Sequence, residues 1–230
     1  MDKEFELLKR VKADKGEEFS DVPTRLSQNE LESDLRKVIV NFSFLYNGGK
    51  LSVDDEKEII VTNIYILLDI LVKMGVHPGF ILATLCKYNY EKIKNKDSIA
   101  YNSRGKKYNG IFFPYDEIRK ELKRMNNFNY TGYNTELHHC YDDIKYVNDK
   151  FKIPYYKEPT VLSNDRKQSI YFSIVNQRTH ISNADDIIDE CVYLVDLIYT
   201  SISILVEMGI KPEKLLLDKI ENEGEKEIHK

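Results

Sequence analysis

Two stretches of the chain carry carboxylates at helical spacing. Asp55 and Asp69 lie on one polar stripe of an otherwise apolar segment, and Asp189, Glu190 and Asp196 recur in a second segment of the same kind. Helix bundles hold metal ions with carboxylates that project inward from facing helices. Asp55, Asp69, Asp189 and Asp196 are therefore candidate ligands for a metal ion. The alternative is that the stripe is a solvated helix face.

A basic segment near the middle of the chain could bind an anion. In "NSRGKKYNG", residues 102–110, Arg104, Lys106 and Lys107 stand beside two glycines. Backbone N–H groups and ammonium heads can approach phosphate oxygens in such a loop. Aromatic residues that could stack on a base are close by: Tyr108, Phe112 and Phe113. The segment indicates a phosphate or nucleotide site, and a solvated basic turn is the alternative.

One further cluster, "ELHHCYDD", contains the metal-ligating types His138, His139, Cys140 and Asp142. Adjacent histidines point to different faces of a helix, and no second pair with zinc spacing follows. A polar helix start is the better interpretation. The chain contains no G-x-S-x-G, Walker A or Rossmann fingerprint.

The two carboxylate-bearing segments are copies of one pattern. Of the 39 residues from 54 to 92, fourteen are identical to the residue 134 positions later, among them Gly75 and Gly209. Upstream, Pro-Thr-x-Leu-Ser occurs at Pro23 and again at Pro159. Such self-similarity predicts a tandem duplication rather than a chance match of two amphipathic helices.

Each copy predicts a long buried helix, a stop and a second helix. The first helix should run from about Asp55 to Gly75, with Gly75 as the stop and Pro78 at the restart. Gly209 and Pro212 do the same in the second copy. Between the copies, one short helix is expected over Tyr115 to Met125.

Composition narrows the class of protein. A chain of 230 residues with 42% hydrophobic and 31% charged residues can bury a sizeable core. Its net charge of −4 argues against nucleic acid as a partner. Three scattered cysteines suit free thiols, the charged N-terminus has no signal-peptide pattern, and polar residues interrupt each apolar run. We expect a cytoplasmic protein with no membrane partner, and the residue usage suggests a low-GC bacterial or phage origin.

Three parts of the chain resemble the all-α NTP pyrophosphatase superfamily of MazG-like, dimeric dUTPase-like and phosphoribosyl-ATP pyrophosphohydrolase-like proteins. "DLIYTSISILVEMGI" is similar to the family's third-helix pattern, with Asp196 in the acidic position. "CYDDIKYVNDKFKIPYYKEPTVLSNDRKQSI" resembles its first helix, proline-containing loop and second-helix start. "KYNYEKIKNKDSIAYNSRGKKYNGIFFPYDEI" resembles the loop after the fourth helix, which puts Asn89 and Lys92 in the phosphate-binding register.

The resemblance implies a Mg²⁺-dependent reaction, and this sequence departs from it at the acidic motifs. The family uses E-x-x-E on helix two and E-x-x-D on helix three to hold Mg²⁺ and activate water. Here Asn41 and Asn176 occupy the approximate glutamate positions, Tyr193 precedes Asp196 by three, and Thr62 replaces Asp196 in the first copy. Neutral amides cannot supply the charge that holds two Mg²⁺ ions. The pocket, including Asn41 and Asn176, is expected to bind nucleotide with weak hydrolysis or none.

The expected fold is all-α, with two tandem four-helix MazG-like units packed as a single-chain pseudo-dimer. Residues 1–92 form the first unit, 93–135 the basic and aromatic connection with its short helix, and 136–230 the second unit. The first functional hypothesis is a degenerate nucleotide-binding protein that sequesters or senses a nucleotide-type small molecule. The alternatives are an active Mg²⁺-dependent pyrophosphohydrolase with Asp189, Glu190 and Asp196 as catalytic candidates, and a non-catalytic helical interaction protein. Homo-oligomer formation stays open.

Overall fold

The computed structural model describes residues 1–94, 115–127 and 137–225, and the regular secondary structure of this part of the chain is all α-helix. Its helices, in chain order, are α1 (Asp2–Lys15), α2 (Gln28–Asn47), α3 (Val53–Lys73), α4 (Gly79–Lys94), α5 (Tyr115–Asn126), α6 (Leu137–Phe151), α7 (Asn164–Ser182), α8 (Ile187–Glu207) and α9 (Glu213–Glu225). The all-α fold class is confirmed, and so is the short helix α5. No helix in the described ranges combines the length and the apolar content needed to cross a bilayer.

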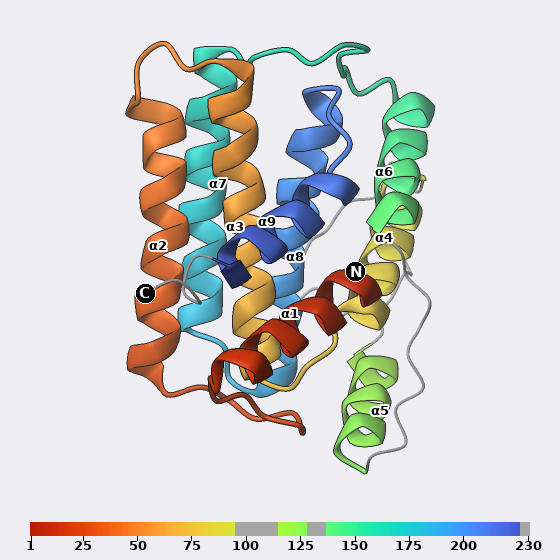
Figure 1. The fold of residues 1–230 in the computed structure, drawn as a ribbon. Coiled ribbons are helices and arrows are strands. Elements are labelled where there is room, and N and C mark those ends of the chain that lie inside the picture. Colours follow the sequence, from red (N-terminus) through yellow and green to blue (C-terminus); the bar gives the residue numbers. More distant parts are fainter. Residues whose placement is uncertain (95–114, 128–136, 226–230) are drawn as a thin grey trace.

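Two long apolar helices form the centre of the structure. α3 and α8 pack against each other, α2 covers α3, α7 covers α8, and α2 also contacts α7 (Figure 1). Almost every apolar residue of α3 and α8 that faces inward is completely buried, including Ile64, Leu68, Ile198 and Leu205. Burying this much apolar surface is the main favourable term in folding, at about 25 cal/mol per Å².

The remaining helices pack around the centre in matching pairs. α1 lies on α9 while α4 lies on α6, and α9 contacts α3 while α4 contacts α8 (Figure 1). α5 packs against α4 and α8, with Ile118 and Leu122 buried beneath it. Apart from those made with α5, the contacts of the N-terminal helices therefore have counterparts in the C-terminal part of the chain.

The glycine stop of each long helix forms the same joint. Gly75 and Gly209 both adopt left-handed backbone, with φ of 66° and 73°. The loop upstream of α2 donates from Ser20 N to Lys73 O (3.1 Å), and the loop upstream of α7 donates from Tyr156 N to Glu207 O (2.8 Å). Glycine is needed here for two reasons. Residues with a side chain rarely adopt the left-handed backbone, and a side chain would collide with the loop that lies so close.

Substituting Gly75 with Ala should destabilise the fold strongly. A Cβ at Gly75 would lie 2.6 Å from the carbonyl oxygens of Ser20 and Val22, so a steric clash adds to the backbone strain. Gly75→Ala should lower the free energy of unfolding by about 2–4 kcal/mol. Gly16 has the same backbone, with φ of 68°, but open space around it, so Gly16→Ala should cost only about 1 kcal/mol. Urea unfolding measures both, and equal losses would contradict the clash.

His77, beside the first joint, is buried as a neutral side chain. Its Nδ1 accepts a hydrogen bond from Gly79 N (3.1 Å), and its ring lies 4.6 Å from that of Phe5. Burial, helped by the nearby amino-terminal ammonium, lowers the pKa of His77 to about 3. The imidazole therefore stays uncharged in the folded protein where an unfolded chain would protonate it.

The free energy of unfolding should fall as the pH is lowered through the weakly acidic range. Between the unfolded pKa of about 6.5 and the folded pKa of about 3, the unfolded chain binds one more proton at this residue than the folded chain does. His77 alone should contribute a slope of up to about 1.4 kcal/mol per pH unit below about pH 6.5. His77→Asn, which keeps an acceptor, should flatten the slope, while His180→Asn on the exposed side of α7 serves as the control. Denaturant midpoints from pH 7 to 4.5 measure it, and an unchanged slope in His77→Asn would refute this assignment.

Candidate functional site

The predicted polar site between the second and third helices of each copy is occupied by amide contacts. Between α2 and α3, Asn41 Nδ2 donates to Asn63 Oδ1 (2.9 Å). Between α7 and α8, Gln177 Nε2 donates to Asp196 Oδ2 (2.9 Å) and to Thr200 Oγ1 (3.1 Å). Asn41 thus contacts α3 through Asn63, which is completely buried.

Asn176 does not face α8, and its neighbour Gln177 takes that position. Asn176 is exposed, whereas Gln177 is partly buried against Asp196. The repeated Val-Asn pair suggested Asn176, but the Pro-Thr-x-Leu-Ser motifs at Pro23 and Pro159 are 136 residues apart. Counting with that spacing leads from Asn41 to Gln177. The signal that identifies Gln177 was therefore in the sequence.

Two of the four candidate metal ligands, Asp55 and Asp69, have separate partners. Asp55 caps the start of α3 by accepting from Ser52 N (2.9 Å), and Asp69 is paired with Lys12 (2.6 Å) and Lys73 (2.9 Å). Asp55 and Asp69 are fourteen residues apart on one helix, which is about 21 Å along its axis. Among the described residues, no three histidine, cysteine or acidic side chains gather closely enough to hold a metal ion.

The second copy's acids are also divided. Asp189 lies in the first turn of α8, where its backbone N–H is capped by Asp186 (3.0 Å), and Asp196 lies two turns further on against Gln177. Glu190, the third catalytic candidate, points to a different part of the fold and is completely buried. These three acids do not converge on one point.

Two buried glutamates, Glu56 and Glu190, connect the N-terminal and C-terminal halves of the structure. Glu56 on α3 is paired with Lys167 of α7 and accepts from Leu162 N (2.8 Å), and both charged side chains are almost fully buried. Glu190 on α8 is paired with Arg25 Nε (2.6 Å), in the loop before α2. Burial raises the pKa of Glu190, and Arg25 opposes that rise. Each glutamate is neutralised by a base from the other half.

A second charged network joins α1, α2 and α3. Lys12 Nζ lies 2.6 Å from Asp69, and Lys73 Nζ lies 2.9 Å from Asp69 and 2.8 Å from Asp34. Although burial disfavours its charged form, the Lys37 and Lys73 ammonium groups hold the pKa of Asp34 below its usual range. The lysines provide the positive charge that the carboxylates would otherwise require from a metal ion.

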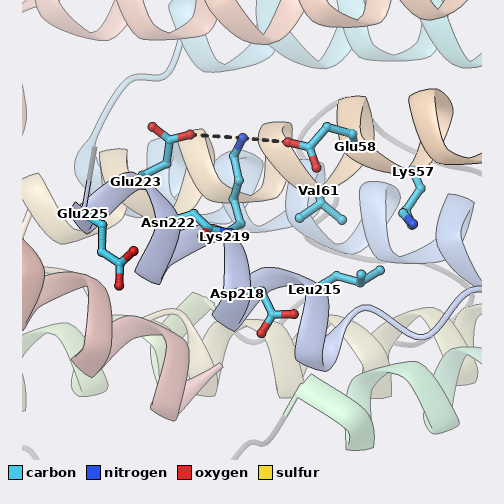
Figure 2. A pocket seen from close by; sticks show the side chains of 9 residues that line it. All are labelled: Lys57, Glu58, Val61, Leu215, Asp218, Lys219, Asn222, Glu223 and Glu225. Atoms are coloured by element: carbon cyan, nitrogen blue, oxygen red, sulfur yellow. Dashed lines mark hydrogen bonds and ion pairs between the residues drawn. The ribbon is translucent and has the colours of Figure 1, made fainter. Parts of the chain in front are cut away.

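A polar cleft lies between α3 and α9 (Figure 2). Its volume of about 530 Å³ falls in the range of small-molecule sites. Val61 and Leu215 form apolar parts of its wall, and Lys219 Nζ extends between Glu58 (2.7 Å) and Glu223 (3.2 Å). Its other polar lining residues are Lys57, Asp218, Asn222 and Glu225. Acidic side chains outnumber basic ones, so the cleft suits a neutral or zwitterionic group better than a bare polyphosphate.

The matching positions on α8 and α4 are apolar. Counting 134 residues from Lys57, Glu58 and Val61 leads to Cys191, Val192 and Val195, which are all buried, and Lys219 corresponds to buried Leu85. The α3–α9 cleft is therefore a feature of one side of the structure. The sequence pattern does not show that Glu58 pairs with Lys219, which lies 161 residues away.

Several predicted binding residues lie outside the described residues. Arg104, Lys106, Lys107, Tyr108 and Phe112 all fall in the range 95–114. Asn89 and Lys92 belong to α4, but their side chains are not among those described. In the "ELHHCYDD" cluster, Cys140 is buried and Asp142 is exposed, so these two do not share a site.

Comparison with known proteins gave no relative. No family model, no curated protein and no solved structure matches the chain.

Breaking the Glu56–Lys167 pair from one side should be costly. Glu56→Gln leaves the Lys167 ammonium buried without a counter-charge, and we expect a loss of about 3–5 kcal/mol in the free energy of unfolding. The double variant Glu56→Gln/Lys167→Met should recover most of it, because no buried charge remains and the glutamine oxygen can still accept from Leu162 N. Asp54→Asn, which removes an exposed pair with Lys57, should cost less than about 1 kcal/mol. Chemical unfolding measures the free energy of unfolding of each variant. Losses that simply add in the double variant would rule out coupling between the two charges.

Proposed function

We propose that the chain is a tandem duplication of a MazG-like four-helix unit, packed as a single-chain pseudo-dimer. The repeated contacts support this: α1 on α9 has its counterpart in α6 on α4, and α9 on α3 has its counterpart in α4 on α8. The two glycine joints, with their matching loop hydrogen bonds, support it independently. That the repeated unit is MazG-like rests only on the sequence motifs that resemble the all-α NTP pyrophosphatase superfamily.

We propose further that the protein binds a nucleotide-type small molecule without hydrolysing it. The observation that carries this proposal is that its acids already have partners among the protein's own side chains. Asp69 and Asp34 are paired with lysines, Glu56 with Lys167, and Asp196 with the amide of Gln177. A Mg²⁺ ion would have to displace these partners, and amides in the glutamate positions could not compensate for its charge.

The cleft and the basic segment are the two proposed ligand regions. The α3–α9 cleft offers hydrogen-bonding groups beside apolar side chains, which suits a base and sugar. The Arg104–Lys107 segment has the composition to bind phosphate. Each region can be altered separately, so their contributions can be distinguished by mutation.

Isothermal titration against nucleoside mono-, di- and triphosphates, with and without Mg²⁺, tests the proposal. We expect at least one nucleotide to bind with an affinity that changes little when Mg²⁺ is removed, and no pyrophosphate release. Lys57→Met/Lys219→Met should weaken binding about tenfold or more if the cleft holds the ligand, while the exposed Lys120→Met on α5 should not. Arg104→Ala/Lys107→Ala tests the basic segment in the same way.

Two outcomes would replace this proposal. Pyrophosphate release that disappears in Asp196→Asn would establish an active Mg²⁺-dependent hydrolase. Failure to bind any nucleotide of the panel would favour a helical interaction protein.

A further inference from the structure

Helices α2 and α7 lie side by side as one layer on the outside of the central pair (Figure 1). They are antiparallel. Tyr46, near the end of α2, stacks on Tyr171 in the first half of α7, with the ring centres 5.7 Å apart. Glu32, near the start of α2, is paired with Arg178 near the end of α7. The last half of α2 and the first half of α7 therefore lie at the same level of the layer.

The outer surface of this part of the layer is uncharged. Residues 38–47 and 168–177 contain no Asp, Glu, Lys or Arg, in a chain of which 31% of the residues are charged. Val40 and Phe44 of α2 are 44% and 61% exposed, and Phe172 of α7 is 59% exposed. The other exposed residues of these two stretches are small or amide-bearing: Asn47, Gln168, Ser169, Ser173 and Asn176. Loss of charge together with exposed aromatic side chains is typical of the centre of a protein–protein interface.

We propose that two copies of the chain dimerise through this outer surface of α2 and α7, the α2/α7 face, with the two-fold axis running along the helices. In this arrangement α2 of each copy packs on α7 of the other copy. Neighbouring helices of the resulting group of four are all antiparallel, as in a four-helix bundle. The uncharged parts of the two faces then meet at the same level, and Phe44 of each copy lies opposite Phe172 of the partner subunit.

The area of the α2/α7 face favours this direction of the axis. The two helices have 20 and 19 residues, so each is about 30 Å long, and two packed helices are about 20 Å wide. Complete overlap would bury about 600 Å² on each copy, or about 1,200 Å² in total, which is the lower limit for a specific interface. An axis across the helices can join the uncharged parts only if the rest of each face stays uncovered, and that halves the buried area.

Sedimentation equilibrium of the full chain, from about 1 to about 100 µM, tests the proposal. The wild-type chain has a mass of 27.0 kDa and should sediment with twice that mass at the upper end of this range. Phe44→Glu and Phe172→Glu should each raise the dissociation constant about 30-fold or more, because a two-fold interface contains each substitution twice. Tyr146→Glu adds the same charge at an exposed aromatic residue of α6 and should leave the dissociation constant unchanged. Circular dichroism verifies that each variant is folded.

A pair of opposite charges tests the direction of the axis. Phe44→Lys and Phe172→Glu should each dimerise weakly when alone. An equimolar mixture of the two variants should form a heterodimer, because the introduced ammonium and carboxylate face each other at one contact and the native phenylalanines meet at the other. A mixture that associates no better than its separate components would overturn this arrangement.

Two further results would overturn the proposal as a whole. A wild-type chain that stays at 27.0 kDa over the whole concentration range would leave the α2/α7 face to a different protein. A dimer that persists unchanged in both Phe44→Glu and Phe172→Glu would have its interface elsewhere on the molecule.

Discussion

The burial of α3 against α8 is the constraint on which the rest of this structure depends. Both helices are apolar around most of their circumference, so neither half of the chain can bury the apolar surface of its central helix alone. Each needs the other as part of its core. Glu56 and Glu190 lie within this packed region and can be buried only because Lys167 and Arg25 reach them from the opposite half. Apolar packing supplies the stability, and these ion pairs restrict how the halves can be aligned.

The features that local sequence determines were predictable. The helix stop at Gly75 and the restart beside Pro78 follow from backbone geometry that only a few residues allow, and the structure has both. Helix α5 was also recognisable from its strong amphipathic pattern over Tyr115 to Met125. The structure extends α5 by a single residue beyond that prediction.

The partners of the polar groups could not be predicted in the same way. Lys219 meets Glu58 and Lys167 meets Glu56 only after more than a hundred intervening residues have folded. The spacing of carboxylates along a helix shows only that they share one face. It is the same whether that face contacts water, a metal ion or lysine side chains. The error at Asn176 has a related cause. A repeated residue pair suggested an alignment that the burial pattern of α7 places one residue away.

The two halves also show that one interface can be maintained with opposite charges. At the end of α3, Lys73 is paired with Asp34 of α2. At the matching end of α8 stands Glu207, and its partner is Arg166 of α7, at 2.8 Å. The pair joins the corresponding helices near the same joint with the signs of the charges reversed, although at the 136-residue spacing Arg166 corresponds to Glu30 and not to Asp34. Lys73 and Glu207 occupy matching positions in the two copies. If a carboxylate were needed at this position to bind a metal ion, a lysine could not stand there, because it would reverse the charge of the site. The exchange is compatible with a structural ion pair, for which only the complementarity of the two charges matters.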